Sequence, residues 1–430
     1  MGVVRTLYSV GMTLAQPLLR RKLARRARAE PGYAEAVEER FGHYTQPACL
    51  PDPLRPVVWV HAVSLGETRA AEVLIRRLRS AVPGMRLLLT HGTATGRAQG
   101  RGLLQPGDVQ VWQPWDTPGA VARFLGHFRP HVGLLMETEV WPNLVAQCAR
   151  QQVPLCLVNA RLSAPSLASA RRLGWLARPA YRALHGVWAQ TQADADRLAQ
   201  LGAPVRGVMG NFKFDASPNA AQLQQGRAWR EAVARPVVVF ASSREGEEQM
   251  LLDALALLRQ DPIASQALGR VQWLLVPRHP QRFDAVAQRC ADAGWTVSRR
   301  SQWAAAPEAA DIWLGDSMGE MALYFGLAQI ALLGGSFAPL GGQNLIEAAA
   351  CACPVITGPH TFNFEEAAQG AVAAGAALRV TDLQHGLQTA LRLLADPAQL
   401  APLQHNAWHW SQSHRGAAER TVQALLPLLR

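Results

Sequence analysis

The stretch Leu332–Glu347, which reads LLGGSFAPLGGQNLIE, decides the fold predicted for this chain. An apolar run enters a loop rich in glycine, and a helix-like stretch, Asn344–Cys353, leaves it. The loop glycines are Gly334, Gly335, Gly341 and Gly342. Strand, glycine loop and helix together present backbone N–H groups to an anion. The sequence therefore predicts a phosphate or nucleotide site here, with Glu347 about one turn into the helix. A tight turn that needs glycine only for its positive φ is the alternative.

The same alternation of apolar runs and helical patterns continues along the chain in two series. The runs lie at 57–62, 86–90, 131–137, 154–160, 186–190 and 205–211, and then at 236–242, 270–277, 311–316, 328–335 and 354–359. Such alternation predicts α/β domains with parallel sheets covered on both faces. We expect an attachment segment at 1–30, Rossmann-like domains at 31–215 and 216–400, and C-terminal helices at 401–430 that pack back toward the first domain. Two facing sheets would enclose one cleft.

Charge is concentrated at the N-terminus. Residues 1–30 hold seven Arg or Lys against one Glu, more than half of the net charge of +11. The uncharged segment 6–19 is about 21 Å long as a helix, short of a hydrocarbon core of about 30 Å. These features predict an anchor that lies on or barely spans an anionic membrane, with the body on the cytoplasmic side. A first helix packed on the protein is the alternative.

The rest of the chain is nearly balanced in charge, which argues against a nucleic-acid groove. Its scattered cysteines, Cys49, Cys148, Cys156, Cys290, Cys351 and Cys353, have no zinc spacing and read as buried thiols in a reducing compartment. The motifs of P-loop nucleotide binding and of zinc or serine hydrolases are missing from the sequence. We expect no metal and no bound cofactor.

Chemically distinctive residues follow the predicted strands, at the edge where ligands bind open α/β sheets. Glu67 follows Ser64-Leu65-Gly66 and opens a helix, so the helix dipole should keep it ionised at neutral pH, as a general base requires. An ordinary first-turn glutamate is the alternative. Glu137 and Glu139 share one side of an extended segment and need a cation or hydrogen-bond donors between them; Lys213 is the best-placed cation. Two carboxylates solvated at the surface are the alternative.

In the second series, Arg278-His279 follows a strand, and arginine binds phosphate well. With the glycine loop and the turn Asp316–Glu320, this predicts a nucleotide-phosphate pocket. A surface arginine is the alternative.

With these residues in view, the chain resembles the 3-deoxy-D-manno-oct-2-ulosonic acid (Kdo) transferases, metal-independent inner-membrane glycosyltransferases of lipopolysaccharide assembly with a GT-B fold. The resemblance covers almost the whole chain. Its motifs are HAVSLGE (61–67), METEVWPNL (136–144), NARLS (159–163), GNFKFD (210–215), SREGEE (243–248), VPRHPQRF (276–283), GDSMGE (315–320) and GGSFAPLGGQNLIEAAA (334–350).

The resemblance implies transfer of Kdo from CMP-Kdo to the lipid A precursor, with Glu67 as proton acceptor and with Glu137 and Lys213 at the transition state. It implies CMP contacts at Pro277, Arg278, His279, Met318, Gly319, Glu320, Asn344, Leu345, Ile346 and Glu347. Further candidate site residues are Ser64, Gly66, Glu139, Gly335, Ser336 and Gly342. The chain departs from the family pattern at Arg244 and Gln343, where histidine is usual. An epimerase or a GT-B enzyme with another sugar nucleotide is the runner-up, and a membrane-surface nucleotide- or nucleic-acid-binding protein is the non-enzyme alternative.

Overall fold

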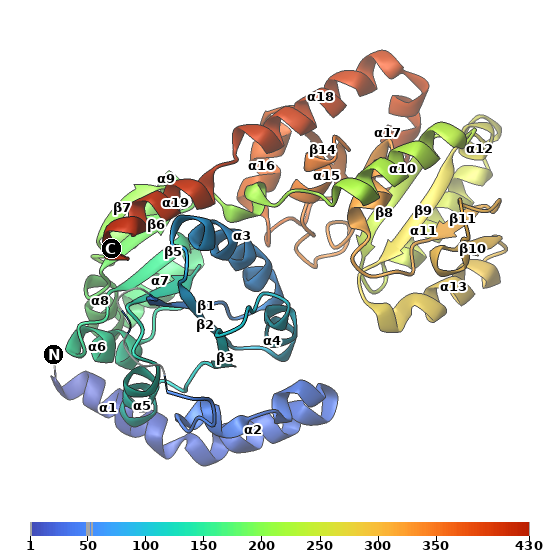
Figure 1. Ribbon diagram of the computed structural model, residues 1–430. Helices are drawn as coiled ribbons and strands as arrows, with labels where there is room; N and C mark the ends of the chain where they lie inside the picture. The colour runs from blue at the N-terminus through green and yellow to red at the C-terminus, as the bar shows by residue number, and fades with distance from the viewer. Residues whose placement is uncertain (1, 49–51, 53–54, 430) are drawn as a thin grey trace. The chain divides into compact units, whose positions relative to one another are not determined.

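The computed structural model describes residues 2–48, 52 and 55–429, and its internal contacts divide the chain into two compact units (Figure 1). Unit 1 comprises residues 1–215 and 415–430, and unit 2 comprises residues 216–414. Each unit is built around its own parallel sheet. The two-domain α/β architecture predicted from the sequence is confirmed.

Unit 1 contains a seven-stranded sheet in the order β3-β2-β1-β4-β5-β6-β7 within its described residues. Its strands are β1 (Val57–His61), β2 (Arg86–His91), β3 (Val109–Trp112), β4 (Val132–Met136), β5 (Leu155–Ala160), β6 (Gly186–Ala189) and β7 (Val205–Val208). Alternate residues of β1 enter different cores: Trp59 packs with Phe124 on one face, and Val58 and Val60 pack with Leu74 on the other. Both faces are therefore covered, as a parallel sheet requires.

The helices of unit 1 come mostly from the connections between its strands. They are α1 (Gly2–Leu14), α2 (Gln16–Ala29), α3 (Leu65–Ala81), α4 (Ala94–Arg101), α5 (Pro118–Phe128), α6 (Pro142–Arg150), α7 (Ala164–Arg172), α8 (Gly174–Arg182), α9 (Gln192–Gln200) and α19 (Ala417–Leu425). Short 3-10 turns occur at η1 (Pro31–Ala34), η2 (Val37–Phe41) and η3 (Phe212–Asp215). Helix α19 joins the core of unit 1 through Ala417, Ala418, Val422 and Leu425.

The N-terminal segment forms two helices at one side of unit 1 (Figure 1). Helix α1 contacts α6 and α8, and Ser9 Oγ donates a hydrogen bond to Asn143 Oδ1 at 2.9 Å. Its Val3, Leu7, Val10 and Leu14 side chains are exposed. Within the described residues, the structure has no helix that combines the length and the apolar character needed to cross a bilayer.

The residues of unit 2 form a second seven-stranded sheet, with the strand order β10-β11-β9-β8-β12-β13-β14. Its strands are β8 (Val237–Ser243), β9 (Gln272–Pro277), β10 (Val297–Arg299), β11 (Ile312–Leu314), β12 (Ile330–Leu333), β13 (Val355–Thr357) and β14 (Ala377–Arg379). Its helices are α10 (Ala220–Ala232), α11 (Glu247–Arg259), α12 (Pro262–Gly269), α13 (Phe283–Asp292), α14 (Met321–Leu327), α15 (Ile346–Ala350), α16 (Glu365–Ala373), α17 (Leu383–Ala395) and α18 (Pro397–Ser413).

The five cysteines that the structure describes are buried and unpaired, as predicted, and Cys49 lies outside the described residues. The strands that the sequence did not predict are β3, β10 and β14.

Candidate functional site

Glu67 lies in the first turn of α3, directly after β1, and its carboxylate folds back on the start of the helix. The Val63 N–H donates to Glu67 Oε2 at 2.9 Å, and Ser64 Oγ donates to Oε1 at 3.0 Å. The Ser64 hydroxyl in turn accepts from the Glu67 N–H at 3.3 Å, which caps α3. The Ser64 cap and the bond from Val63, the residue before the cap, together fix the carboxylate at the carboxyl end of β1. Gly66 is exposed beside it.

The pKa of Glu67 is higher than the predicted stabilisation of its charge by the helix dipole would give. Burial raises its pKa to about 7, the Val63 N–H opposes this rise, and the charges of Glu137 and Glu139 add to it. The helix dipole and the capping bonds do not offset the burial. The pKa of the carboxyl thus lies close to neutral pH, in the range best suited to general acid–base chemistry.

Glu137 follows β4 and pairs with a cation that the sequence analysis did not select. Arg161 Nε donates to Glu137 Oε2 at 2.6 Å, and the glutamate is 4 % exposed. Glu137 also has a left-handed backbone, with φ of +58°. A non-glycine residue in this region stores strain, and such strain is common where a side chain must be aimed at a site. The motif NARLS contained the signal, because Arg161 directly follows β5, the neighbour of β4.

Glu139 lies two residues farther along and accepts a hydrogen bond from Trp141 Nε1 at 2.8 Å. Burial raises the pKa of its carboxyl, the Trp141 bond opposes the rise, and Glu137 adds to it. Because Glu137 and Glu139 both raise the pKa of Glu67, the three carboxylates form one electrostatically linked group, here called the carboxylate cluster.

Lys213 lies on η3, a turn that packs on α3, the helix of Glu67. Two asparagines set the backbone of this turn. Asn159 Oδ1 of β5 accepts from Phe212 N at 3.1 Å, and Asn211 Oδ1 accepts from Lys213 N at 2.9 Å. The structure thus brings the Lys213 turn, Glu67 and β5 together in unit 1.

In unit 2, Arg278 and His279 follow Pro277, the last residue of β9. The Arg278 N–H donates to Ser243 O at 3.0 Å, which joins this turn to the end of β8. Burial lowers the pKa of His279, and the charges of Arg244, Arg278 and Arg282 lower it further. Arg244, one of the departures from the family pattern, therefore adds to a positive region that suits a phosphate.

The glycine loop does not offer all its N–H groups to a ligand, as the sequence suggested. Glu247, a fully buried residue of α11, accepts hydrogen bonds from Gly335 N at 2.6 Å, Phe337 N at 3.2 Å and Ala338 N at 3.3 Å. A carboxylate of the protein itself thus occupies an anion site in the loop. Ser336 is also fully buried, and its hydroxyl accepts from Gly358 N at 2.8 Å.

The helix after the loop is shorter than predicted, because α15 begins at Ile346. Asn344 Oδ1 accepts from Ile346 N at 3.1 Å, while Asn344 Nδ2 donates to Glu347 Oε1 at 3.1 Å. Gly341 and Gly342 precede this turn with φ of +90° and +75°. The side chains of Leu345 and Ile346 are buried and are not open to a ligand.

The turn Asp316–Glu320 follows β11. Glu320 pairs with Arg300 at 2.8 Å, and Gly319 has φ of +80°. Met318 is 55 % exposed, and the Gly319 carbonyl accepts from Gln222 Nε2 at 3.0 Å. Met318 is therefore the most accessible side chain of this turn for a ligand contact.

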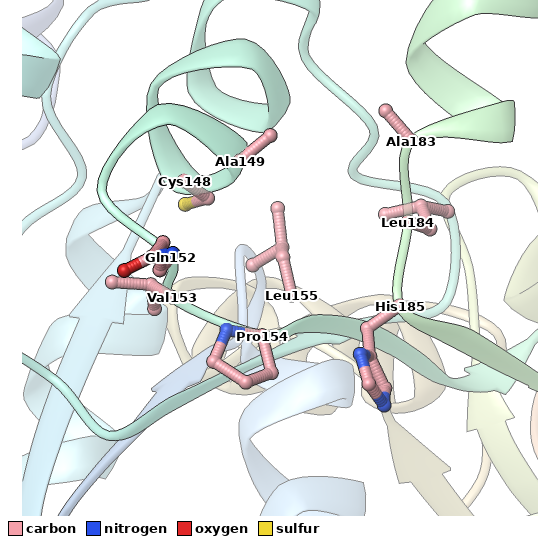
Figure 2. A pocket seen from close by; sticks show the side chains of 9 residues that line it. All are labelled: Cys148, Ala149, Gln152, Val153, Pro154, Leu155, Ala183, Leu184 and His185. Carbon is pink, nitrogen blue, oxygen red and sulfur yellow. The ribbon is translucent and has the colours of Figure 1, made fainter.

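A hollow of about 370 Å³ lies in unit 1. Figure 2 shows its lining residues, which are Cys148, Ala149, Gln152, Val153, Pro154, Leu155, Ala183, Leu184 and His185. The hollow lies where β5 begins, whereas Arg161 and the carboxylate cluster lie where strands end. Because ligands of α/β sheets bind at the carboxyl ends of strands, this hollow is not the candidate site. In the described part of the chain, no three His, Cys, Asp or Glu side chains are grouped as a metal site would need.

Comparisons with known proteins agree with this architecture. A family profile described as "3-Deoxy-D-manno-octulosonic-acid transferase (kdotransferase)" matches residues 35–216. The 3-deoxy-D-manno-octulosonic acid transferase of Bordetella pertussis is 48% identical over 98% of both chains. The enzyme of the same name from Haemophilus influenzae is 31% identical over 99% of both.

Among solved structures, a UDP-GlcNAc 2-epimerase from Neisseria meningitidis covers 86% of this chain and 100% of its own, with a TM-score of 0.57 and 15% identity. At that identity the likeness concerns the fold alone. The Bordetella pertussis and Haemophilus influenzae enzymes, in contrast, match this chain in sequence over 98% and 99% of its length. The chain therefore belongs to the 3-deoxy-D-manno-octulosonic acid transferase family of glycosyltransferases.

Proposed function

We propose that this enzyme transfers Kdo from CMP-Kdo to a hydroxyl of the lipid A precursor, with Glu67 as the general base and without a metal ion. The observation that carries the proposal is the Glu67 carboxylate, held at a strand end with a pKa of about 7. Glu67 accepts the proton of the acceptor hydroxyl as that oxygen attacks the anomeric carbon of Kdo. The bond from that carbon to the CMP phosphate breaks, and CMP leaves.

In this proposal, the other site residues stabilise charge and hold the reacting groups in position. Arg161 pairs with Glu137, whose charge acts on Glu67, and the Lys213 turn packs on α3, the helix of Glu67. Arg244 and Arg278 stabilise the phosphate of CMP, which removes the need for a metal, while Arg282 is paired with the buried Glu248. Glu320 and Glu347 lie on the two turns that we expect to contact the nucleoside.

The test is a transfer assay with purified enzyme, CMP-Kdo and tetra-acylated lipid A precursor, read by mass spectrometry. Wild type should add Kdo, and Glu67→Gln should lose roughly 100- to 10,000-fold in rate, the usual contribution of general base catalysis. Glu72→Gln on the same helix is the matched control. The activity should persist in EDTA. A fully active Glu67→Gln would move the base role elsewhere, and transfer abolished by EDTA would refute metal independence.

We further propose that α1 and α2 attach the enzyme to the cytoplasmic face of an anionic inner membrane. The exposed Leu7 and Leu14 of α1 and the exposed Arg21, Arg25 and Arg28 of α2 supply apolar and basic contacts. Replacing the three arginines by glutamine should weaken binding to phosphatidylglycerol vesicles roughly 100-fold, since each basic residue contributes about 1 kcal/mol. Equal binding by the variant would contradict this role of α2.

A further inference from the structure

Behind Glu67 lies a buried imidazole that the mechanism above does not use. His91, the last residue of β2, is fully buried. Its Nδ1 lies 2.9 Å from the carbonyl oxygen of Ala62, which follows β1. A carbonyl can only accept, so Nδ1 carries the proton and donates it.

The other side of the ring fixes the same tautomer. Gln110 Nε2 of β3 lies 2.9 Å from His91 Nε2 and also donates to Arg97 O at 2.8 Å. The amide nitrogen is a donor, so His91 Nε2 must accept. Space for this pair depends on Gly100 of α4, because a Cβ at that position would overlap His91 Nε2 and Gln110 Nε2.

The Ala62 carbonyl and the Val63 N–H belong to one peptide group. His91 binds the oxygen of this group, and the N–H at its opposite side donates to Glu67 Oε2 at 2.9 Å. A hydrogen bond to a peptide oxygen polarises the group and strengthens its N–H as a donor. The sequence of contacts is therefore Gln110, His91, the Ala62–Val63 peptide and Glu67.

We propose that His91 is a positioning residue for Glu67: it orients and polarises the peptide whose N–H holds the Glu67 carboxylate. The proposal rests on the proposed role of Glu67 as the base. His91 remains neutral over the working pH range, because burial lowers its pKa to about 4, the bond to Ala62 opposes this, and Arg97 lowers it further. It thus acts as a fixed donor and not as a proton carrier.

The charged and titratable groups near this chain of contacts come from several elements of unit 1, among them Arg97 with its partner Glu39, and Arg40. Glu137 and Glu139 face Glu67 from the segment after β4. Arg97 of α4 faces His91, and His61 of β1 is its titratable neighbour, kept neutral because burial lowers its pKa to about 3. Replacing His91 by an uncharged residue therefore leaves the carboxylates of the cluster in place and changes the hydrogen bond to Ala62.

The experiment compares His91→Leu, which removes the donor, with His91→Asn, whose side-chain amide nitrogen takes the place of Nδ1. In the full-length enzyme, the Glu67 carboxyl is titrated by carbon-13 NMR and assigned by its loss in Glu67→Gln. His91→Leu should raise the pKa of Glu67 by about 0.5. The acid limb of kcat/KM should rise by the same amount, with about a threefold loss at pH 6 and recovery near pH 9. His91→Asn should behave as wild type.

His131→Leu is the matched control, because His131 is also bonded to the backbone of the β1 segment, but its Nδ1 accepts from Val57 N at the opposite end of the strand. It should leave the titration of Glu67 unchanged. A His91→Leu enzyme that loses activity equally at all pH values, with an unshifted Glu67, would overturn the proposal in favour of a structural role.

If His91→Leu does not fold, Gln110→Leu tests the same contacts, since it removes the donor that holds the His91 ring with Nδ1 toward Ala62. It should raise the pKa of Glu67 as well, and an unchanged pKa would overturn the proposal. Failure of the base assignment is distinguishable: Glu67→Gln would then remain active, while the NMR titration would still report the link between His91 and Glu67.

Discussion

A single residue, Glu67, carries both the proposed chemistry and a cost in stability. Its sequence context is that of an ordinary first-turn glutamate, for which the helix dipole favours the charged form. Burial and two neighbouring carboxylates reverse this preference and raise the pKa to about 7. The pKa of the Glu67 carboxyl therefore lies close to neutral pH, where the group can both accept and release a proton.

This raised pKa predicts how the stability of the protein depends on pH. The folded protein binds the Glu67 proton more tightly than the unfolded chain, so protonation of Glu67 stabilises the fold. This contribution to stability is complete below the unfolded pKa near 4.3 and is lost as pH rises through the folded pKa of about 7. Glu67→Gln, which cannot ionise, should therefore raise the melting temperature at pH 8 and change it little at pH 4.5. Thermal unfolding at both pH values checks this. A stabilisation that is equal at both would contradict it.

Arg161 offers a second prediction at the residue scale. Arg161→Gln removes the cation from a buried, strained Glu137, so the carboxylate cluster should rearrange and kcat should fall roughly 10- to 100-fold. The transfer assay measures this. Arg171→Gln, on the exposed part of α7, should keep wild-type activity. An active Arg161→Gln enzyme would mean that the pair serves neither position nor charge.

At the scale of elements, the loop after β12 is held by Glu247 of α11. Glu247→Gln would place an amide NH₂ among the Gly335, Phe337 and Ala338 N–H groups and leave buried donors without acceptors. We expect a loss of about 2–3 kcal/mol in the free energy of unfolding, measured in urea. Glu245→Gln, two residues away and exposed, should cost nearly nothing. Equal stabilities of the two variants would contradict the assigned role of Glu247.

Most strands could be predicted from the sequence, and the three that were not predicted are all edge strands. β3, β10 and β14 all lie at the edge of a sheet, where one side has no neighbouring strand. Edge strands need no continuous apolar run, and β10 reads Val-Ser-Arg. The apolar pattern therefore predicted the central strands of both sheets and missed three of their four edge strands.

The site was predictable where chemistry is local and missed where partners are distant in sequence. Glu67 and Glu137 stand at strand ends that the pattern reveals. Glu247, in contrast, lies 88 residues from Gly335, and only the folded chain shows that a carboxylate fills that turn. The pKa of Glu67 depends in the same way on residues about 70 positions farther along the chain.

At the scale of the whole molecule, the chain leaves unit 1 after Asp215 and enters it again at Arg415. Asp215 ties these points together, because its carboxylate accepts hydrogen bonds from Gly416 N and Ala418 N at the start of α19. The residue therefore caps α19 and ends the turn that carries Lys213. The sequence predicted that residues 401–430 pack back toward the first domain, but only residues 415–430 do so, because α18 (Pro397–Ser413) belongs to unit 2.

Asp215→Asn should weaken this cap by about 1 kcal/mol and loosen α19. Limited proteolysis should then cut the variant faster than wild type near Arg415, and hydrogen exchange should increase in α19. Asp196→Asn, an exposed residue of α9, is the control. Unchanged cleavage and exchange would show that the apolar contacts of α19 suffice.

The return of α19 to unit 1 also sets an order of events during synthesis of the protein. The core that contains Leu74 and Val60 is incomplete until Val422 and Leu425 have been translated. Residues 216–414 form a unit that is continuous in sequence, so unit 2 can finish folding while unit 1 still waits for its last helix. The half of the enzyme that carries Glu67 is thus made first and completed last.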